Sequence, residues 1–237
     1  MANLLSQIAR ANASVLSGLK LSQKHTLPIP LQSNISLDRL ADLGARDPDI
    51  AWPVFQALWT ELTTANTESN PRPPILLALD GLAHVMTTTQ YRDAESKPIH
   101  AHDLVIIKHF MDHLSSVRSL PNGGLVIAAT SKSNSPKIPS LELALSQMEA
   151  RASGNTEIPQ GNPFQHVDDR VMQSLEGVSA TKLQGLTKEE ARGLMEYYAK
   201  SGILRQTVSE ALVSEKWTLS GGGIVGELER ATVKMRI

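Results

Sequence analysis

Apolar residues recur at helical spacing through the first third of the chain. The pattern predicts helices over residues 3–17, 36–44 and 48–65, with Ser36 as the N-cap of the second helix and Gly44 as its stop. On the third helix, five apolar residues recur at the three- and four-residue spacing of one helix face: Trp52, Phe55, Leu58, Trp59 and Leu62. The first third is therefore predicted to be helical.

The pattern changes in the middle of the chain, where two short runs are apolar without interruption. Residues 75–79 follow two prolines and end on Asp80 and Gly81, and residues 125–130 follow a PNGG turn. Such runs are typical of strands that are buried on both faces. Residues 103–120 between them have helical periodicity, and the order strand, helix, strand predicts a right-handed crossover between two parallel strands. The predicted fold class is therefore α/β.

The remaining residues complete this core and predict a second, smaller domain. A short helix is expected within residues 140–150 and a short strand over residues 179–186. Thr187, Glu190 three residues later and Gly202 mark a helix that begins with a capping box. Two more helical pieces follow, at about 205–214 and 223–234. We place a boundary near residue 186, between an α/β core of residues 1–186 and a helical domain of residues 187–237.

Composition and charge narrow the classes of function. The 237 residues carry 23 basic and 24 acidic side chains, a net charge of −1, which argues against a surface that binds nucleic acid as a whole and leaves a local basic patch open. The absence of cysteine excludes disulfides, zinc–cysteine sites and cysteine nucleophiles. No apolar run approaches the ~20 residues of a membrane-spanning helix.

The first twenty residues allow two interpretations. Arg10, Lys20, several serines and the lack of an acid before Asp38 are loosely typical of a mitochondrial transit peptide. A single arginine in the first nineteen residues makes a poor presequence, however. We therefore favour an amphipathic helix that belongs to the fold.

Candidate chemistry lies where the two predicted strands end, because parallel α/β sheets bind ligands at the carboxyl ends of their strands. Asp80 is placed there to hold Mg²⁺, through water, beside the phosphates of a nucleotide, as a Walker B aspartate does. Gly81 comes next, and Thr130 and Ser131 end the second strand, where a hydroxyl could reach a terminal phosphate. The alternative is that Asp80 and Gly81 only form the turn after a strand.

Two absences from the sequence limit that site. No G-x-x-x-x-G-K-[ST] loop occurs, so the backbone cradle and the phosphate-binding lysine of such a loop are missing. Many ATPases of this broad type have a glutamate after the aspartate as the base that polarises water, and Gly81 cannot do this. We therefore assign no catalytic residue and expect nucleotide hydrolysis to be slow or absent.

Three other features carry weaker signals. His109 and His113 are one helical turn apart and could share a metal ion, but Phe110 stands where an H-E-x-x-H motif has its base, so a polar helix face is favoured. The glycines of residues 219–223 could present N–H groups to a phosphate, although we favour a plain loop before the last helix. Residues 187–237 carry eight basic and seven acidic side chains, so an RNA-contacting face is the alternative to a solvated one.

Several segments taken together resemble one family. PPILLALDGLAHV, YRDAESKPIHAHDLVIIKHF, GGLVIAATSKS, NPFQHVDDRV, LTKEEARGLMEYYAKSGIL and LSGGGIVGELER are similar, in order and spacing, to the death-associated protein family of mitochondrial small-subunit ribosomal proteins. The resemblance covers most of the chain from about residue 35 onward. In this comparison Asp80 matches the Walker B aspartate of the family, and Thr130 and Ser131 match its sensor region.

The resemblance implies a P-loop NTPase core of the AAA+-like kind, followed by a small helical, winged-helix-like domain. It implies GTP or GDP with Mg²⁺ as cofactor, and a place in the head of the small ribosomal subunit in the mitochondrial matrix. The implied partners are the small-subunit ribosomal RNA, neighbouring mitochondrial ribosomal proteins and bridge contacts to the large subunit. The family's phosphate-binding loop and two strands would precede residue 1, so we expect a C-terminal portion of a longer protein that binds nucleotide only together with that loop.

These inferences favour a structural ribosomal protein with a nucleotide site that hydrolyses weakly or not at all. Two alternatives stay open: an active GTPase or ATPase switch, and a signalling adaptor unrelated to ribosomes.

Overall fold

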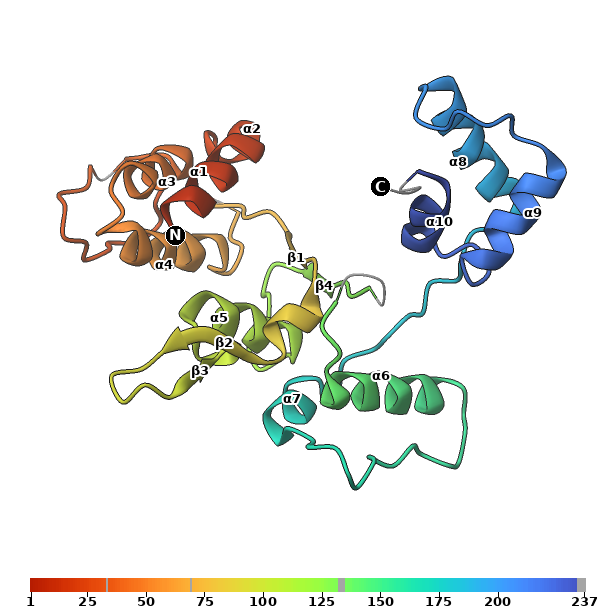
Figure 1. Ribbon diagram of the computed structural model, residues 1–237. Helices are drawn as coiled ribbons and strands as arrows, with labels where there is room; N and C mark the ends of the chain where they lie inside the picture. Colours follow the sequence, from red (N-terminus) through yellow and green to blue (C-terminus); the bar gives the residue numbers. More distant parts are fainter. Residues whose placement is uncertain (33, 69, 132–134, 234–237) are drawn as a thin grey trace. The chain divides into compact units, whose positions relative to one another are not determined.

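The computed structural model describes residues 1–32, 34–68, 70–131 and 135–233 (Figure 1). Its helices include α1 (Ala2–Ala11), α2 (Ala13–Leu16), α3 (Leu37–Arg46), α4 (Ala51–Leu62), α5 (Val105–Leu114), α6 (Pro139–Ala152) and α7 (Asp169–Ser174). Three more helices, α8 (Lys188–Lys200), α9 (Glu210–Leu219) and α10 (Val225–Thr232), follow toward the C-terminus. The chain forms two compact units, Met1–Asp80 with Asp103–Ala128, and Gly81–His102 with Ala129–Ile237. The domain boundary near residue 186 stays a prediction.

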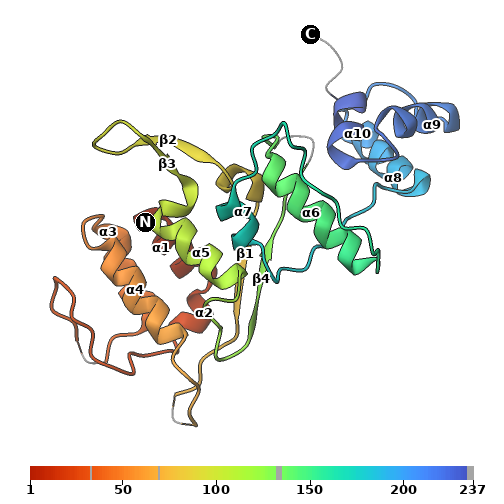
Figure 2. The ribbon, with the colours of Figure 1, turned by 90° about the horizontal axis from the view of Figure 1, so that it is seen from below.

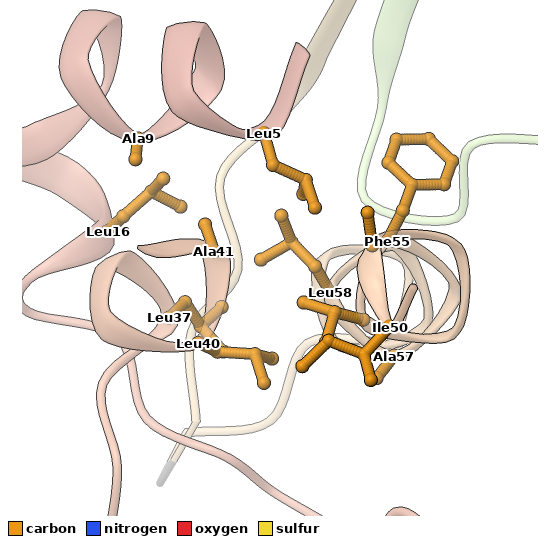
Figure 3. Close-up of a cluster of buried hydrophobic side chains, with 12 residues drawn as sticks. Leu5, Ala9, Leu16, Leu37, Leu40, Ala41, Ile50, Phe55, Ala57 and Leu58 are labelled. Carbon is orange, nitrogen blue, oxygen red and sulfur yellow. The ribbon is translucent and has the colours of Figure 1, made fainter. Parts of the chain in front are cut away.

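The N-terminal helices pack into a layer around a shared apolar core (Figures 1 and 2). Leu5 of α1, Leu40 of α3 and Leu58 of α4 are almost completely buried there (Figure 3). Burying one such side chain stabilises a fold by about 1.5–3 kcal/mol. The structure confirms helices within residues 3–17, with a break at Asn12, and so confirms the favoured interpretation of the first twenty residues.

Gly44 has a different role from the predicted one. α3 continues to Arg46, so the prediction that Gly44 stops this helix is wrong. A Cβ atom at Gly44 would lie 2.6 Å from Leu5 Cδ1 and 2.8 Å from Val54 Cβ. The glycine therefore lets α1 and α4 approach α3 closely. A glycine near the end of an apolar pattern suits either role, and only the neighbours decide between them.

The strands β1 (Ile75–Leu79) and β4 (Gly124–Ala128) form a parallel pair whose register runs from Ile75↔Gly124 to Leu79↔Ala128. This pair and the intervening α5 confirm the α/β prediction. The prediction that both strands are buried on both faces is wrong, because Leu76 is 64%, Leu125 57% and Ile127 43% exposed. Leu76 and Leu125 are register partners, and alternate residues of a strand share a face, so the three side chains lie on one open face. In the described part of the chain this sheet has two strands.

A hairpin that the sequence pattern did not predict lies between β1 and α5 in the sequence. Its strands, β2 (Thr88–Arg92) and β3 (Pro98–His100), pair antiparallel. The Asp93 carboxylate accepts hydrogen bonds from the backbone N–H groups of Glu95 and Lys97 in the turn. Most residues of β2 are exposed, so the strand lacks the apolar alternation from which strands are predicted.

A buried ion pair links α4 to two loops of the same unit. The Glu61 carboxylate accepts a hydrogen bond from Arg72 Nη2 at 2.5 Å, and both side chains are fully buried. The backbone N–H and the hydroxyl of Ser22 donate to Glu61 at 2.9 and 2.6 Å, and His25 Nε2 lies 2.7 Å from it. Burial alone would raise the pKa of Glu61, but the hydrogen bonds from Ser22, His25 and Gln23 outweigh it and hold the pKa below its usual value.

Helices α8, α9 and α10 pack on a small apolar core of their own. The predicted capping box is confirmed: Thr187 Oγ1 accepts from the Glu190 N–H at 3.2 Å, and Glu190 Oε2 accepts from the Thr187 N–H at 2.8 Å. Gly202, with φ of +74°, follows the helix as predicted. The described residues 187–233 contain no strand, so the winged-helix part of the prediction is not confirmed.

The segment of residues 179–186 does not form the predicted strand. It is held instead at its end, where the Leu186 N–H donates to Gly223 O at 2.8 Å and Trp217 Nε1 donates to Leu186 O at 2.7 Å. A Cβ atom at Gly185 would lie 2.1 Å from Gly222 O, so the backbones come very close here. The glycines of residues 219–223 form a loop before α10, as predicted, and the loop packs against this segment.

Candidate functional site

The predicted nucleotide-binding edge begins where β1 and β4 end. Their last residues, Leu79 and Ala128, are register partners, and Asp80 follows the first of them directly. Because the strands are parallel, the chain leaves both at the same edge of the sheet. Beyond the strands, the Leu82 N–H donates to Ala129 O at 2.8 Å. The strand order and direction that the sequence predicted for this edge are therefore present.

The four predicted site residues are accessible to different degrees. Asp80, Thr130 and Ser131 are exposed, and Gly81 is half-buried. Gly81 has φ of +75° and opens the short 3₁₀ helix η1 (Leu82–Val85), so it does form the predicted turn after the strand. Asp80 belongs to one unit and the other three residues to the second. Their joint action as a nucleotide site stays a prediction.

The donor set at this edge suits one kind of metal binding. The described residues hold no group of three or more His, Cys, Asp or Glu side chains that could bind a metal ion by themselves. Mg²⁺ beside a nucleotide keeps several waters and needs only one or two carboxylates, since the phosphates supply other ligands. The exposed Asp80 fits that arrangement, in which Mg²⁺ would neutralise charge on the phosphates, and does not fit a metal site built from protein alone.

The histidines of α5 do not form the predicted polar helix face, and that prediction is wrong. His113 is 4% exposed, and the His109 ring stands edge-on to Trp59, with centroids 4.7 Å apart. Burial lowers the pKa of His109 to about 4 and also lowers the pKa of His113. Both imidazoles are therefore neutral at pH 7 and behave as aromatic rings. Their spacing suggested one face of a helix, but not that α4 would cover that face.

An aromatic groove between α4 and α5 is a feature that the sequence did not reveal. It has a volume of about 280 Å³, and its lining includes Trp52, Trp59 and His109 together with Lys108 and Arg118. The spacing of the tryptophans predicted a helix over residues 48–65 but not how far its side chains are covered, and both tryptophans are half-buried. The available signal for the groove in the sequence was the presence of ring-bearing side chains on two separate helices, within residues 52–59 and 109–113.

Comparison with known proteins decides the family. Residues 1–231 match the family described as mitochondrial ribosomal death-associated protein 3. The chain belongs to this family. The small ribosomal subunit protein mS29 of Neurospora crassa is 47% identical over 232 residues, which cover 97% of this chain and 49% of that protein. The mS29 protein of Schizosaccharomyces pombe is 26% identical over 221 residues, covering 92% and 43%.

Membership of the death-associated protein 3 family confirms the resemblance seen in the sequence and extends it to the N-terminal helices, since the match begins at residue 1. It also confirms the predicted location in the mitochondrial matrix, where proteins of the mitochondrial ribosome reside. The chain spans about half the length of the curated relatives it matches. No helix in the described ranges is both long and apolar enough to cross a bilayer.

Proposed function

We propose that this chain is a structural part of the mitochondrial small ribosomal subunit, and that its nucleotide site orders the protein without driving a reaction. The observation that carries this proposal is the family match across residues 1–231, together with relatives that are named as small-subunit proteins. Ribosomal RNA and neighbouring ribosomal proteins are the partners of such a component. The finer placement that we propose is the head of the subunit, with bridge contacts to the large subunit.

Asp80 and Gly81 after β1, and Thr130 and Ser131, which lie beyond the end of β4 at Ala128 and not in the strand as predicted, support a site that binds nucleotide but turns it over slowly or not at all. Asp80 is exposed at the edge and suits hydrated Mg²⁺, and Thr130 and Ser131 carry exposed hydroxyls that suit a terminal phosphate. Gly81 supplies no base to activate water. Binding still matters for stability, because a ligand at 100 times its Kd stabilises a fold by about 2.7 kcal/mol. GTP or GDP with Mg²⁺ is the proposed ligand, bound when a phosphate-binding loop from outside these 237 residues completes the site.

The open face of the β1–β4 sheet supports a core that is larger than this chain. Leu76, Leu125 and Ile127 expose apolar surface side by side. A contiguous apolar patch on a soluble protein usually marks an interface. We propose that further strands and helices of the same polypeptide cover this face, in agreement with relatives about twice as long as the chain.

Sedimentation of the complete protein tests this proposal. A tagged complete protein should co-migrate with the small ribosomal subunit in a sucrose gradient of mitochondrial lysate, and the purified protein should retain guanine nucleotide without releasing phosphate. Asp80→Ala should lower the retained nucleotide, whereas Asp42→Ala, an exposed carboxylate on α3, should not. Recovery only at the top of the gradient would favour an adaptor, and steady phosphate release would favour a GTPase or ATPase switch.

A further inference from the structure

The wall of the groove on α4 is built from flat rings. Trp52 and Phe55 have ring centroids 5.6 Å apart and planes 20° apart, and Phe55 and Trp59 have centroids 6.2 Å apart and planes 19° apart. Three rings thus run along one side of the helix, each nearly parallel to its neighbour. His109 of α5 stands edge-on to Phe55 at 5.3 Å between centroids. Rings arranged in this way accept a further flat ring by offset stacking.

The rim of the groove is positively charged. Lys108 Nζ lies 3.5 Å and Arg118 Nε lies 3.3 Å from the Asp112 carboxylate, so one acid holds two cations. The side chains of Lys108 and Arg118 are 65% and 55% exposed, whereas that of Asp112 is only 15% exposed. The cations therefore face solvent and the acid lies beneath them. His109 adds no charge at pH 7, because burial lowers its pKa to about 4.

We infer that this groove binds an unpaired ribonucleotide, with its base against Trp52 and Trp59 and its phosphate at Lys108 and Arg118. Proteins recognise unpaired RNA by stacking its bases on aromatic side chains, while Lys and Arg neutralise the backbone. A purely apolar peptide would use the rings but would not use the positive charge that remains at the rim, where one carboxylate, Asp112, faces the two cations Lys108 and Arg118. The identification of the RNA as ribosomal rests on the proposed function; the site itself rests on the geometry of α4 and α5.

A binding titration with single-stranded RNA tests the inference. The probe is a ten-nucleotide RNA of mixed sequence with a fluorescent label, titrated with the 237-residue chain and followed by anisotropy at low salt. In a Trp217→Phe background, tryptophan fluorescence comes only from Trp52 and Trp59, so its quenching by unlabelled RNA reports binding in the groove. A double-stranded RNA of the same length should bind more weakly, since its bases are already stacked.

Substitutions separate the stacking from the charge. Trp52→Leu keeps apolar volume but removes the ring, and it should weaken binding about tenfold, in line with the loss of one base stack. Lys108→Ala and Arg118→Ala should each weaken binding at low salt and reduce the salt slope, d log K/d log [salt], by about 0.7, as expected for one phosphate contact to a single strand. Arg10→Ala removes an exposed charge of α1 that does not line the groove, and it should bind as the parent does.

Several results would overturn the inference. The inference fails if RNA does not quench the tryptophan fluorescence at low salt, or if Trp52→Leu binds RNA with full affinity. It also fails if Arg10→Ala and Lys108→Ala lose RNA affinity equally. Stronger quenching by an apolar or proline-rich peptide than by RNA would assign the groove to a protein partner instead. If Trp52→Leu does not give a cooperative unfolding transition, Trp52→Phe and the two charge substitutions decide the matter.

The two proposals fail in distinguishable ways. If the complete protein co-migrates with the small subunit but the 237-residue chain binds no single-stranded RNA, the groove is rejected as an RNA site and the ribosomal role stands. If the groove binds RNA but the complete protein never sediments with the subunit, the ribosomal role is rejected and the groove stays as an RNA site.

Discussion

Removing the carboxylate of Glu61 should destabilise the N-terminal unit strongly. In Glu61→Ala, the guanidinium of Arg72 loses its partner at 2.5 Å while it stays 3% exposed. Arg72 cannot be deprotonated, and its position between α4 and β1 keeps it away from water. Ser22 and Gln23, which also donate to Glu61, are exposed and can turn to water instead, and the half-buried His25 keeps some access to water. Most of the cost should therefore come from the buried arginine.

The expected loss of stability follows from the buried charge of Arg72. Breaking a buried ion pair by removing one partner costs about 3–5 kcal/mol, because the other charge is left uncompensated. Replacing both charges together, with Glu61→Leu and Arg72→Met, should cost less than about 2 kcal/mol, since no buried charge remains. Glu68→Ala removes an exposed acid of the same unit and should change the stability by less than about 0.5 kcal/mol.

The assay is urea unfolding of the chain in a Trp217→Phe background. Trp52 and Trp59 lie on the same helix as Glu61, so their fluorescence follows the unit that contains the ion pair. This choice of probe matters because a chain of two units need not unfold in one step. A loss below about 1 kcal/mol in Glu61→Ala, or an equal loss in the double substitution, would refute the reasoning that the buried arginine dominates.

The hydrogen bonds that Glu61 accepts also fix the sign of a pH effect. The folded-state pKa of Glu61 lies below its unfolded value of 4.5, so the folded state binds this proton less readily than the unfolded state. The stability that the ionised carboxylate contributes is then present above pH 4.5 and is lost as the pH falls through the folded pKa. In Glu61→Gln, this part of the acid-induced loss should disappear from a series of urea titrations below pH 4.5.

Four further substitutions test other parts of the structure. Gly44→Ala should destabilise the chain by about 1–3 kcal/mol in urea unfolding despite the better helix propensity of alanine, because the added Cβ would lie 2.6 Å from Leu5 Cδ1. Thr187→Ala should cost about 1 kcal/mol, measured by amide hydrogen exchange in α8, because it removes an N-cap. Leu76→Ser, on the open sheet face, should cost less than about 1 kcal/mol in the isolated chain, by the same urea assay, because a 64% exposed side chain loses little burial. In His109→Phe, the His109 share of the stability that the parent loses between pH 6.5 and about pH 4 should be retained, because the parent's unfolded state binds a proton on His109 there that its folded state does not.

The sequence pattern predicted the elements whose signals are local. The capping box of Thr187 and Glu190 depends on four consecutive residues, and the parallel pair β1–β4 on two apolar runs with a helix between them. The capping box and each apolar run are complete within a short window, so each identifies its own helix or strand without knowledge of distant parts of the chain.

The same pattern failed where burial depends on distant parts of the chain. Leu76 and Ile127 have the composition of a strand buried on both faces, but whether a face is covered depends on elements that a local pattern does not contain. His109 and His113 were assigned to a polar face because histidine is polar on average. Their rings lie instead against Trp59, a contact between α5 and α4 that no local window includes.

The two candidate sites differ in how much of each this chain contains. The aromatic groove is lined by α4, α5 and Arg118, which follows α5, all inside one unit that also contains an apolar core and a buried ion pair. The edge at Asp80 belongs to a sheet with an open apolar face, and the sequence has no phosphate-binding loop. RNA binding in the groove should therefore be measurable on the chain itself and should not depend on added GTP. Nucleotide binding at Asp80 should require the complete protein, and a nucleotide-dependent change in groove affinity on the chain alone would contradict this separation.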